Sequence, residues 1–199
     1  MLRLLPILAL FLAFSSGIVF AATNDAPTAR SHNPVHRTTT PHTMQLVQVT
    51  TPVPYDEVTA RLYGLLGPLN SGKVLPGATS VADLEARVAS VVGSSDFMHF
   101  VEYNHGSWFQ LYNANPTPRF KVYVIGNPLV AETMVKFDLR AAYNVPFRLM
   151  ILENGNATKI VHQLPSSVID LSGPEDMRSA AASLDQKLEA LVDKMAAVV

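Results

Sequence analysis

Two apolar runs on either side of an Asn-Gly turn constrain the fold of this chain more than any other feature. Residues 146–153 read PFRLMILE, residues 158–164 read TKIVHQL, and the sequence NGNA stands between them. A turn of this composition between two such runs predicts a β-hairpin. The chain is therefore expected to contain an antiparallel pair of strands near its C-terminal end.

The rest of the sequence alternates between helical and strand patterns. Apolar residues recur at steps of three and four in the helical segments, whereas the strand segments are short apolar or aromatic runs. Because the strands come mostly as hairpins, we expect an α+β fold with helices on one face of an antiparallel sheet. The predicted elements are a strand at 44–51, helices at 54–67 and 80–93, a hairpin of strands 97–103 and 108–113 around the turn 104–107, a strand at 119–126, and helices at 127–137 and 172–199.

Local signals mark the ends of these helices. Ser80 with Asp83 resembles a capping box, and Ser172 with Glu175 can cap the last helix. Gly67 and Gly93 are expected to end the first and second helices.

The first 21 residues fit a secretory signal peptide. Arg3 precedes a long apolar run that ends in small residues, so we expect cleavage after Ala21 or Ala22 and a secreted, extracellular protein. A membrane anchor is the alternative, but Pro6 and a Ser-Ser-Gly sequence interrupt the run. No later stretch is long and apolar enough to span a bilayer, so no stable membrane span is expected after cleavage.

Residues 22–43 are predicted to form a disordered arm before a folded domain at 44–199. They are rich in Thr, Pro, Asn and Ala and almost free of large apolar residues. The arm could carry O-linked sugars or be removed as a pro-segment. Its histidines, at positions 32, 36 and 42, are expected to be solvated rather than to bind metal.

Charge and cysteine content exclude several functions. The sequence holds 15 basic and 16 acidic residues, and loss of Arg3 with the signal peptide leaves a net charge of about −2. No basic patch stands out, so nucleic acid is not expected as a partner. The absence of cysteine excludes thiol catalysis and Zn–thiolate sites, and the 48% of apolar residues must hold the fold without disulfides.

The sequence IGNP, residues 125–128, joins an apolar strand to a helix. Asn127 is a good N-cap, and Pro128 fits the first helical position because its missing N–H is not needed there. The free N–H groups at this helix start could also meet an anion, but a phosphate-binding loop would have more glycines and a lysine. We interpret the junction mainly as structural, with part of a ligand pocket as the alternative.

The sequence EYNHGSW, residues 102–108, holds the best reactive candidate. Histidine is the side chain best suited to proton transfer near neutral pH, and His105 lies in a predicted turn beside Glu102, Tyr103 and Trp108, with Gly106 expected at positive φ. A Glu and a His can act as a general-base pair or as metal ligands, but Asn-His-Gly is also ordinary turn chemistry.

Two further histidines lie within predicted strands. His99 is expected to be a satisfied core or sheet histidine, and His162 would join a metal site only if it met His105 and Glu102 at one end of the sheet.

Asn156-Ala157-Thr158 is an N-glycosylation sequon in the predicted turn of the C-terminal hairpin. In a eukaryotic host, Asn156 is expected to carry a glycan. In a bacterium the sequon would have no such meaning.

Several short sequences resemble the domain of unknown function 302 family. They are NHGSW at 104–108, VIGNPLVAETM at 124–134, VPFRLMILENGNATKI at 145–160 and LPSSVI at 164–169, and the resemblance extends over about residues 44–197. It implies a fold of the TATA-binding-protein-like type, with a curved antiparallel sheet backed by helices, and it implies no activity. The chain departs from the family pattern at Asn104 and near His162 and Gln163.

The leading hypothesis is a binding module that holds a small apolar or amphipathic ligand between the sheet and its helices. The aromatic residues of the middle strands motivate it, although such rings can equally form a core. The alternatives are an enzyme or metal protein that uses His105 and Glu102, and a homodimer formed through a sheet edge or the last helix. No catalytic residue, metal ligand or cofactor is assigned, and His105, Asn127, Trp108 and Tyr103 are the candidate ligand-binding residues.

Overall fold

The computed structural model describes residues 35–169 and 173–198. The chain divides into two compact units, Met1–Thr40 and Pro41–Val199. In the first unit, the described residues 35–40 are exposed and form no helix or strand. The predicted signal peptide and most of the predicted arm lie outside the described residues. All helices and strands reported below belong to the second unit.

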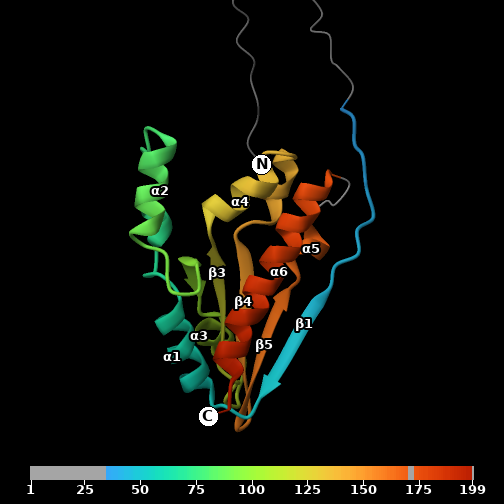
Figure 1. The fold of residues 1–199 in the computed structure, drawn as a ribbon. Helices are drawn as coiled ribbons and strands as arrows, with labels where there is room; N and C mark the ends of the chain where they lie inside the picture. The colour runs from blue at the N-terminus through green and yellow to red at the C-terminus, as the bar shows by residue number, and fades with distance from the viewer. Residues whose placement is uncertain (1–34, 170–172, 199) are drawn as a thin grey trace, which may run out of the picture. The chain divides into compact units, whose positions relative to one another are not determined.

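The second unit contains an antiparallel sheet with the strand order β1-β5-β4-β3-β2 (Figure 1). The sheet is curved and does not close on itself, as expected for the predicted fold class. Its strands β4 and β5 form the predicted C-terminal hairpin, with Gly155 at φ +63° in the turn. The strands are β1 (Leu46–Thr51), β2 (Met98–Tyr103), β3 (Phe120–Gly126), β4 (Phe147–Asn154) and β5 (Ala157–Gln163).

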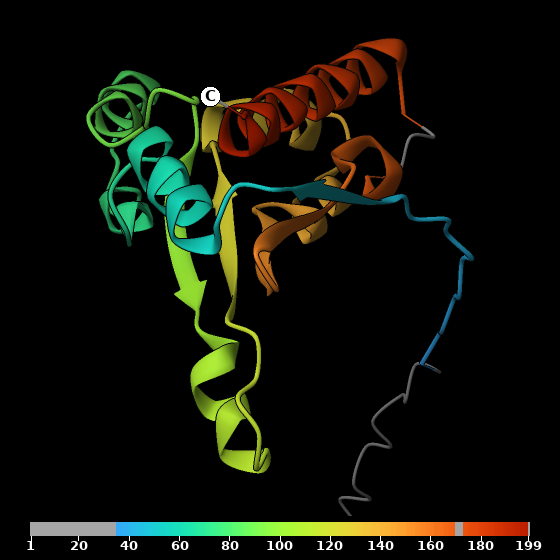
Figure 2. The same cartoon turned by 90° about the horizontal axis from the view of Figure 1, so that it is seen from below.

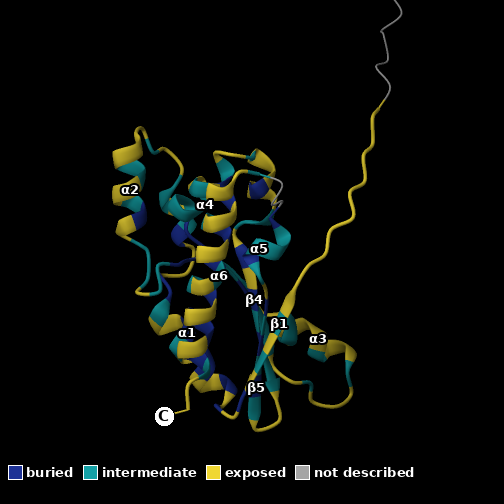
Figure 3. Ribbon diagram, turned by 45° about the vertical axis from the view of Figure 1, so that its right-hand side comes forward, coloured by how far each residue is buried: buried dark blue, intermediate teal, exposed yellow. Residues whose placement is uncertain are grey.

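Helices cover one face of this sheet, and the longest, α6, lies along it against α1 (Figures 1 and 3). The helix α4 follows β3 and also packs on α6. The helical segments are α1 (Tyr55–Leu65), η1 (Ser71–Val74), α2 (Val81–Ala89), α3 (His105–Phe109), η2 (Gln110–Tyr112), α4 (Pro128–Val135), η3 (Leu139–Asn144), α5 (Pro165–Val168) and α6 (Glu175–Ala196). Among the described residues, none of these helices is long and apolar enough to cross a membrane.

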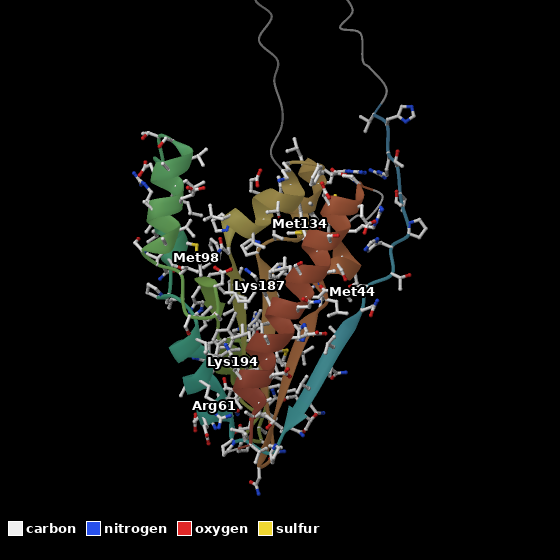
Figure 4. All side chains as sticks on the ribbon, in the orientation of Figure 1. Met44, Arg61, Met98, Met134, Lys187 and Lys194 are labelled. Carbon is white, nitrogen blue, oxygen red and sulfur yellow. The ribbon has the colours of Figure 1, made fainter. Side chains whose placement is uncertain are left out.

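The core lies between the helices and the covered face of the sheet. Strand residues that alternate onto this face, such as Tyr123, Leu149 and Ile160, are fully buried. Met134 of α4, labelled in Figure 4, is buried with them. The predicted apolar stripe of the last helix supplies the other half of the core through Met177, Ala181, Leu184, Leu188, Leu191 and Met195.

The opposite face of the sheet, here called the open face, has only partly buried residues at its centre. Val122 pairs with Tyr103 on one side and with Met150 on the other, and Met150 pairs with Val161 of β5. These side chains form an apolar row across four strands, because cross-strand partners share a face.

The predicted hairpin of strands 97–103 and 108–113 is wrong. β2 pairs with β3 instead, and residues 105–112 form the helical segments α3 and η2 between them. Asn104 caps α3 by accepting a hydrogen bond from the Ser107 N–H at 3.2 Å. Gly106 therefore lies inside a helix, and the positive φ expected for it is absent, since Gly77 and Gly155 are the described glycines with positive φ.

Two of the expected caps are confirmed. Ser80 accepts the Asp83 N–H at 3.1 Å, and Asn127 accepts the Leu129 N–H at 2.9 Å with Pro128 in the first helical turn. Ser172 lies outside the described residues, and the last helix begins after Pro174 without a side-chain cap.

α1 stops directly before Gly67, with Leu66 as its C-cap, as expected, whereas α2 ends at Ala89 and its C-cap Ser90 lies three residues before Gly93. Both glycine N–H groups donate to the Phe97 carbonyl oxygen at 3.0 Å. A Cβ at Gly67 would lie 1.8 Å from the Val91 oxygen, so these glycines are required by close backbone approach.

Candidate functional site

Three predicted site residues meet at the aromatic arm, which we define as residues 104–118 between β2 and β3. The His105 ring stacks on Tyr103 with centroids 5.9 Å apart, and its Nδ1 accepts a hydrogen bond from the Trp108 indole N–H at 3.2 Å. Phe120, the first residue of β3, contacts both His105 and Phe109. The His105 ring is therefore surrounded by the aromatic rings of Tyr103, Trp108 and Phe120.

The fourth predicted residue, Asn127, lies at the opposite end of β3 and does not join this cluster. Its Oδ1 caps α4, and its Nδ2 donates to the Asp96 carbonyl and carboxylate oxygens at 3.2 and 3.0 Å. Asp96 forms an ion pair with Lys187 of α6. The side-chain amide of Asn127, directly after β3, thus forms hydrogen bonds with both the start of α4 and the loop before β2.

An apolar cavity of about 200 Å³ lies beside Asn127. It opens between the end of β3, the start of α4, and side chains from β2, β4 and α6. A Cβ at Gly126 would lie 3.1 Å from the Cβ of Pro146, so a larger residue here would crowd its wall. The main apolar side chains of the lining are Phe100, Val130, Ala131, Pro146, Phe147 and Leu184.

Glu102 does not contact His105, although the two are close in sequence. Its Oε1 accepts a hydrogen bond from the Lys121 ammonium group at 2.6 Å, and its Oε2 accepts one from the Tyr63 hydroxyl at 2.6 Å. Tyr103, which contacts His105, follows Glu102 in an extended strand, so their side chains point to opposite faces.

The ion pair changes the protonation of both partners. Burial alone would raise the pKa of Glu102, but hydrogen bonds from Lys121 and Tyr63 outweigh it and lower that pKa. Burial alone would lower the pKa of Lys121, yet its hydrogen bonds to Glu102 and Tyr63 raise it. Both groups are therefore charged at neutral pH, and Glu102 is a weak base.

Behind this ion pair lies a group of buried polar atoms without hydrogen-bond partners in the described part of the chain. They are Thr59 Oγ1, His99 Nε2 and the Tyr123 hydroxyl. The His99 ring lies 5.7 Å from the Tyr123 ring and 6.1 Å from the Tyr63 ring. Burial lowers the pKa of His99 and raises that of Tyr123, so both side chains are neutral at physiological pH.

The polar residues of the aromatic arm face a second cavity of about 470 Å³, on the α1 side of α3. Asn104, Ser107 and Gln110 form one wall, and Tyr55 with Arg119 forms another. Arg119 lies over the Tyr55 ring and forms ion pairs with Asp56 and Glu153, which raise its pKa. This cavity could hold a polar molecule, but its cations already have carboxylate partners.

The remaining predicted residues are placed apart from these features. His162 is buried in β5, and the described residues include no cluster of three His, Asp or Glu side chains that could hold a metal ion. Asn156 is exposed in the β4–β5 turn. Of the N-terminal histidines that the structure describes, His36 and His42 are both exposed, and His42 contacts the Ser167 carbonyl oxygen at 2.5 Å.

Sequence reasoning named Asn127, which lines the cavity, but found neither the rest of the lining nor the Lys121–Glu102–Tyr63 cluster. The cavity collects residues from five segments far apart in the sequence, so no local pattern could reveal it. The cluster left a clearer signal, since Lys121 and Glu102 are charged residues within largely apolar strands.

The comparisons with known proteins agree with this architecture. Residues 73–195 match the family described as domain of unknown function DUF302, and the chain belongs to this family. One similar solved structure is the crystal structure of an uncharacterized conserved protein DUF302 from Bacillus stearothermophilus, with a TM-score of 0.53 and 16% sequence identity. The alignment covers 75% of this chain and 96% of that one, and at this identity it shows the fold alone. No curated protein matches the chain.

Proposed function

We propose that the protein is a secreted binding module that holds a small apolar or amphipathic ligand in the cavity beside Asn127. The observation that carries the proposal is the cavity itself, about 200 Å³ in volume and lined almost entirely by apolar side chains. An engineered apolar cavity of about 150 Å³ stays dry and binds benzene, so a space of this size and polarity suits a single ring or a short alkyl chain.

The lining also limits the chemistry of the ligand. Asn127 supplies the polar side chain of the cavity lining. Both the oxygen and the nitrogen of the Asn127 amide already form hydrogen bonds with protein atoms. A charged group placed inside would lose its hydration without gaining a partner. We therefore expect an uncharged apolar portion in the cavity and any polar end of the ligand in solvent.

Direct binding of small apolar probes to the purified protein tests the proposal. Indole, benzene and octanoate are suitable probes, followed by ligand-observed NMR and by native mass spectrometry of the protein as purified. We expect a Kd on the order of 0.1 to 1 mM for such small molecules. Failure of every probe to bind, together with a bare mass, would count against a ligand site.

A filled cavity gives the matched control. Ala131 lines the cavity on α4, whereas Ala190 is exposed on α6. Ala131→Leu should weaken probe binding at least tenfold by occupying the space, and Ala190→Leu should leave it unchanged. Equal binding to both variants would place the ligand elsewhere.

Two other hypotheses stay predictions with less support. An enzyme that uses His105 with Glu102 would need the two side chains to approach, and Glu102 is engaged by Lys121 and Tyr63. A homodimer through β1 would use an edge whose residues Leu46, Gln48 and Thr50 are exposed. Analytical ultracentrifugation at micromolar concentration tests it, and a monomer would exclude a stable dimer.

Secretion and glycosylation form part of the same proposal. The apolar N-terminal run supports secretion, and exposure of the Asn156 turn supports modification. Secreted from a eukaryotic cell, the protein should start at Ala22 or Thr23 and lose mass on treatment with peptide-N-glycosidase. Asn156→Gln should remove that mass difference, and an unchanged difference would exclude Asn156 as the acceptor.

A further inference from the structure

The aromatic arm presents large apolar side chains to solvent. Trp108 is 50% exposed, Leu111 83% and Tyr112 81%. Figure 2 shows α3 and the loop after it projecting from the ends of β2 and β3, away from α1, α2 and α6. The exposed side chains are therefore accessible together rather than scattered over the molecule.

The arm is also free of formal charge, since residues 104–118 contain no Asp, Glu, Lys or Arg. A second exposed apolar segment, Phe137–Tyr143, contrasts with it. There Leu139 and Tyr143 are exposed as well, but Asp138 and Arg140 stand between them. An uncharged segment with Trp, Tyr, Phe and Leu is suited to a lipid–water interface, where aromatic rings concentrate.

The open face of the sheet adjoins the arm, because Tyr103 and Phe120 are strand residues whose rings contact His105 of the arm. Its charged residues are Arg148 and Lys159, and the strand residues that alternate onto this face include no Asp or Glu. Neither basic side chain forms an ion pair or hydrogen bond within the described ranges. The charge of this face is thus complementary to an anionic surface.

We propose that the aromatic arm and the open face dock on an anionic lipid surface. Trp108, Leu111 and Tyr112 enter the lipid–water interface, while Lys159 and Arg148 face phosphate-bearing headgroups. The combination of an apolar insert with flanking basic residues is how peripheral proteins bind lipid reversibly without spanning it. The inference is independent of the cavity beside Asn127.

Vesicle binding tests the proposal, and Trp108 supplies the signal because it is the only tryptophan in the sequence. The purified protein is titrated with vesicles of phosphatidylcholine alone or mixed with phosphatidylserine. We expect co-sedimentation with the mixed vesicles, a blue shift of the tryptophan emission, and weaker binding as salt is raised. Absence of both co-sedimentation and a blue shift at saturating lipid would overturn the proposal.

Matched variants separate insertion from charge. Leu111→Asp with Tyr112→Asp should reduce the partition coefficient at least tenfold, whereas Leu139→Asp with Tyr143→Asp should change it less than twofold. Arg148→Gln and Lys159→Gln should each cost roughly fivefold on mixed vesicles and nothing on phosphatidylcholine alone. Circular dichroism checks that the variants stay folded.

Two further results would overturn the proposal. If the variant L111D/Y112D binds mixed vesicles as well as the parent does, the arm is not the lipid contact and the proposal fails. If the parent self-associates without lipid and L111D/Y112D is monomeric, the arm is a contact between copies, and the proposal fails in favour of a homodimer.

Discussion

His99 is a neutral histidine held without a hydrogen bond to Nε2 from any described residue. Its ring is 1% exposed and lies between Tyr63 and Tyr123. The side-chain hydrogen bonds that described residues make to His99 are at its backbone, where Ser71 Oγ accepts the His99 N–H at 2.9 Å and donates to the His99 carbonyl oxygen at 3.0 Å. Protonation would bury a charge whose desolvation outweighs the attraction of the Glu102 carboxylate, so the structure depends on the neutral imidazole.

We therefore predict that stability falls as pH is lowered through the ordinary range of histidine. The pKa of His99 in the folded state is below its value of 6.5 in the unfolded chain, so the unfolded state takes up the proton first. The stabilisation of the fold by neutral His99 is complete above about pH 7. It is lost as pH falls from the pKa of His99 in the unfolded chain to its lower pKa in the folded protein. Urea unfolding at about pH 7.5 and about pH 5.5 measures it.

His99→Phe should remove this pH dependence, because phenylalanine fits between the two tyrosine rings and does not titrate. His36→Phe, in the exposed N-terminal segment, should leave it unchanged. An equal loss of stability on acidification in parent and His99→Phe would mean that other groups cause it.

Lys121 and Glu102 form a partly buried ion pair, with 24% and 16% of their side chains exposed. We predict that Lys121→Met lowers the free energy of unfolding by about 2 kcal/mol, because it leaves the Glu102 carboxylate partly desolvated and unpaired. Adding Glu102→Gln to this variant should recover part of the lost free energy of unfolding. Lys136→Met, which breaks an exposed pair with Glu132, should cost less than about 0.5 kcal/mol.

Chemical denaturation at neutral pH measures these differences. The deficit of Lys121→Met should shrink as pH falls from neutral, because burial raises the pKa of the unpaired Glu102 and the variant protonates this carboxylate before the parent does. A Lys121→Met protein as stable as its parent would show that the pair contributes specificity or positioning only.

At the scale of elements, the junction between β3 and α4 is fixed by one amide. Asn127→Ala should lower the free energy of unfolding by about 2 kcal/mol, because it removes both the helix cap and the bonds to Asp96. Asn127→Ser keeps a capping oxygen and should cost about half as much. Denaturant midpoints with unchanged m-values test this.

The same variants separate structure from recognition at this junction. If Asn127→Ala unfolds with the parent's midpoint but loses affinity for the apolar probes, then Asn127 serves the ligand rather than the helix.

How far the elements could be predicted depends on how local their determinants are. The β4–β5 hairpin and the α4 junction were correct, because an Asn-Gly turn and an Asn-Pro cap act within a few residues. The segment 108–113 was wrongly predicted as a strand on its aromatic content. Counted from His105, its residues Trp108, Phe109 and Tyr112 follow the helical steps of three, four and seven, and this period was the better signal.

The features of the candidate sites were less predictable, because most of them depend on contacts between residues that are far apart in the sequence. Tyr103, His105 and Trp108 are near one another in sequence and do meet. Their pairing with Glu102 was not observed, because strand alternation sends neighbouring side chains to opposite faces. The cavity beside Asn127 depends on Leu184 and Phe147, whose proximity arises only once the sheet and α6 have packed.

At the scale of the whole molecule, the first compact unit should be dispensable for folding. All residues of the buried core lie between Val53 and Met195, within the unit that begins at Pro41. A protein that starts at Pro41 should have the same free energy of unfolding as the full chain within about 0.5 kcal/mol. Paired urea denaturation curves test this, and a clear loss of stability would show that earlier residues support the fold.

The aromatic arm also affects the chain entropy of folding. β2 and β3 are adjacent and antiparallel, with Tyr103 paired to Val122, so a short turn could join them, yet 16 residues from Asn104 to Arg119 make the connection. Each doubling of a loop costs about 0.6 kcal/mol in closure entropy, so this connection is about 2 kcal/mol less favourable than the shortest turn. Replacing it with Asn-Gly should therefore yield a domain that folds faster and unfolds at higher temperature. In the native protein, the aromatic arm is therefore present at a cost in folding free energy.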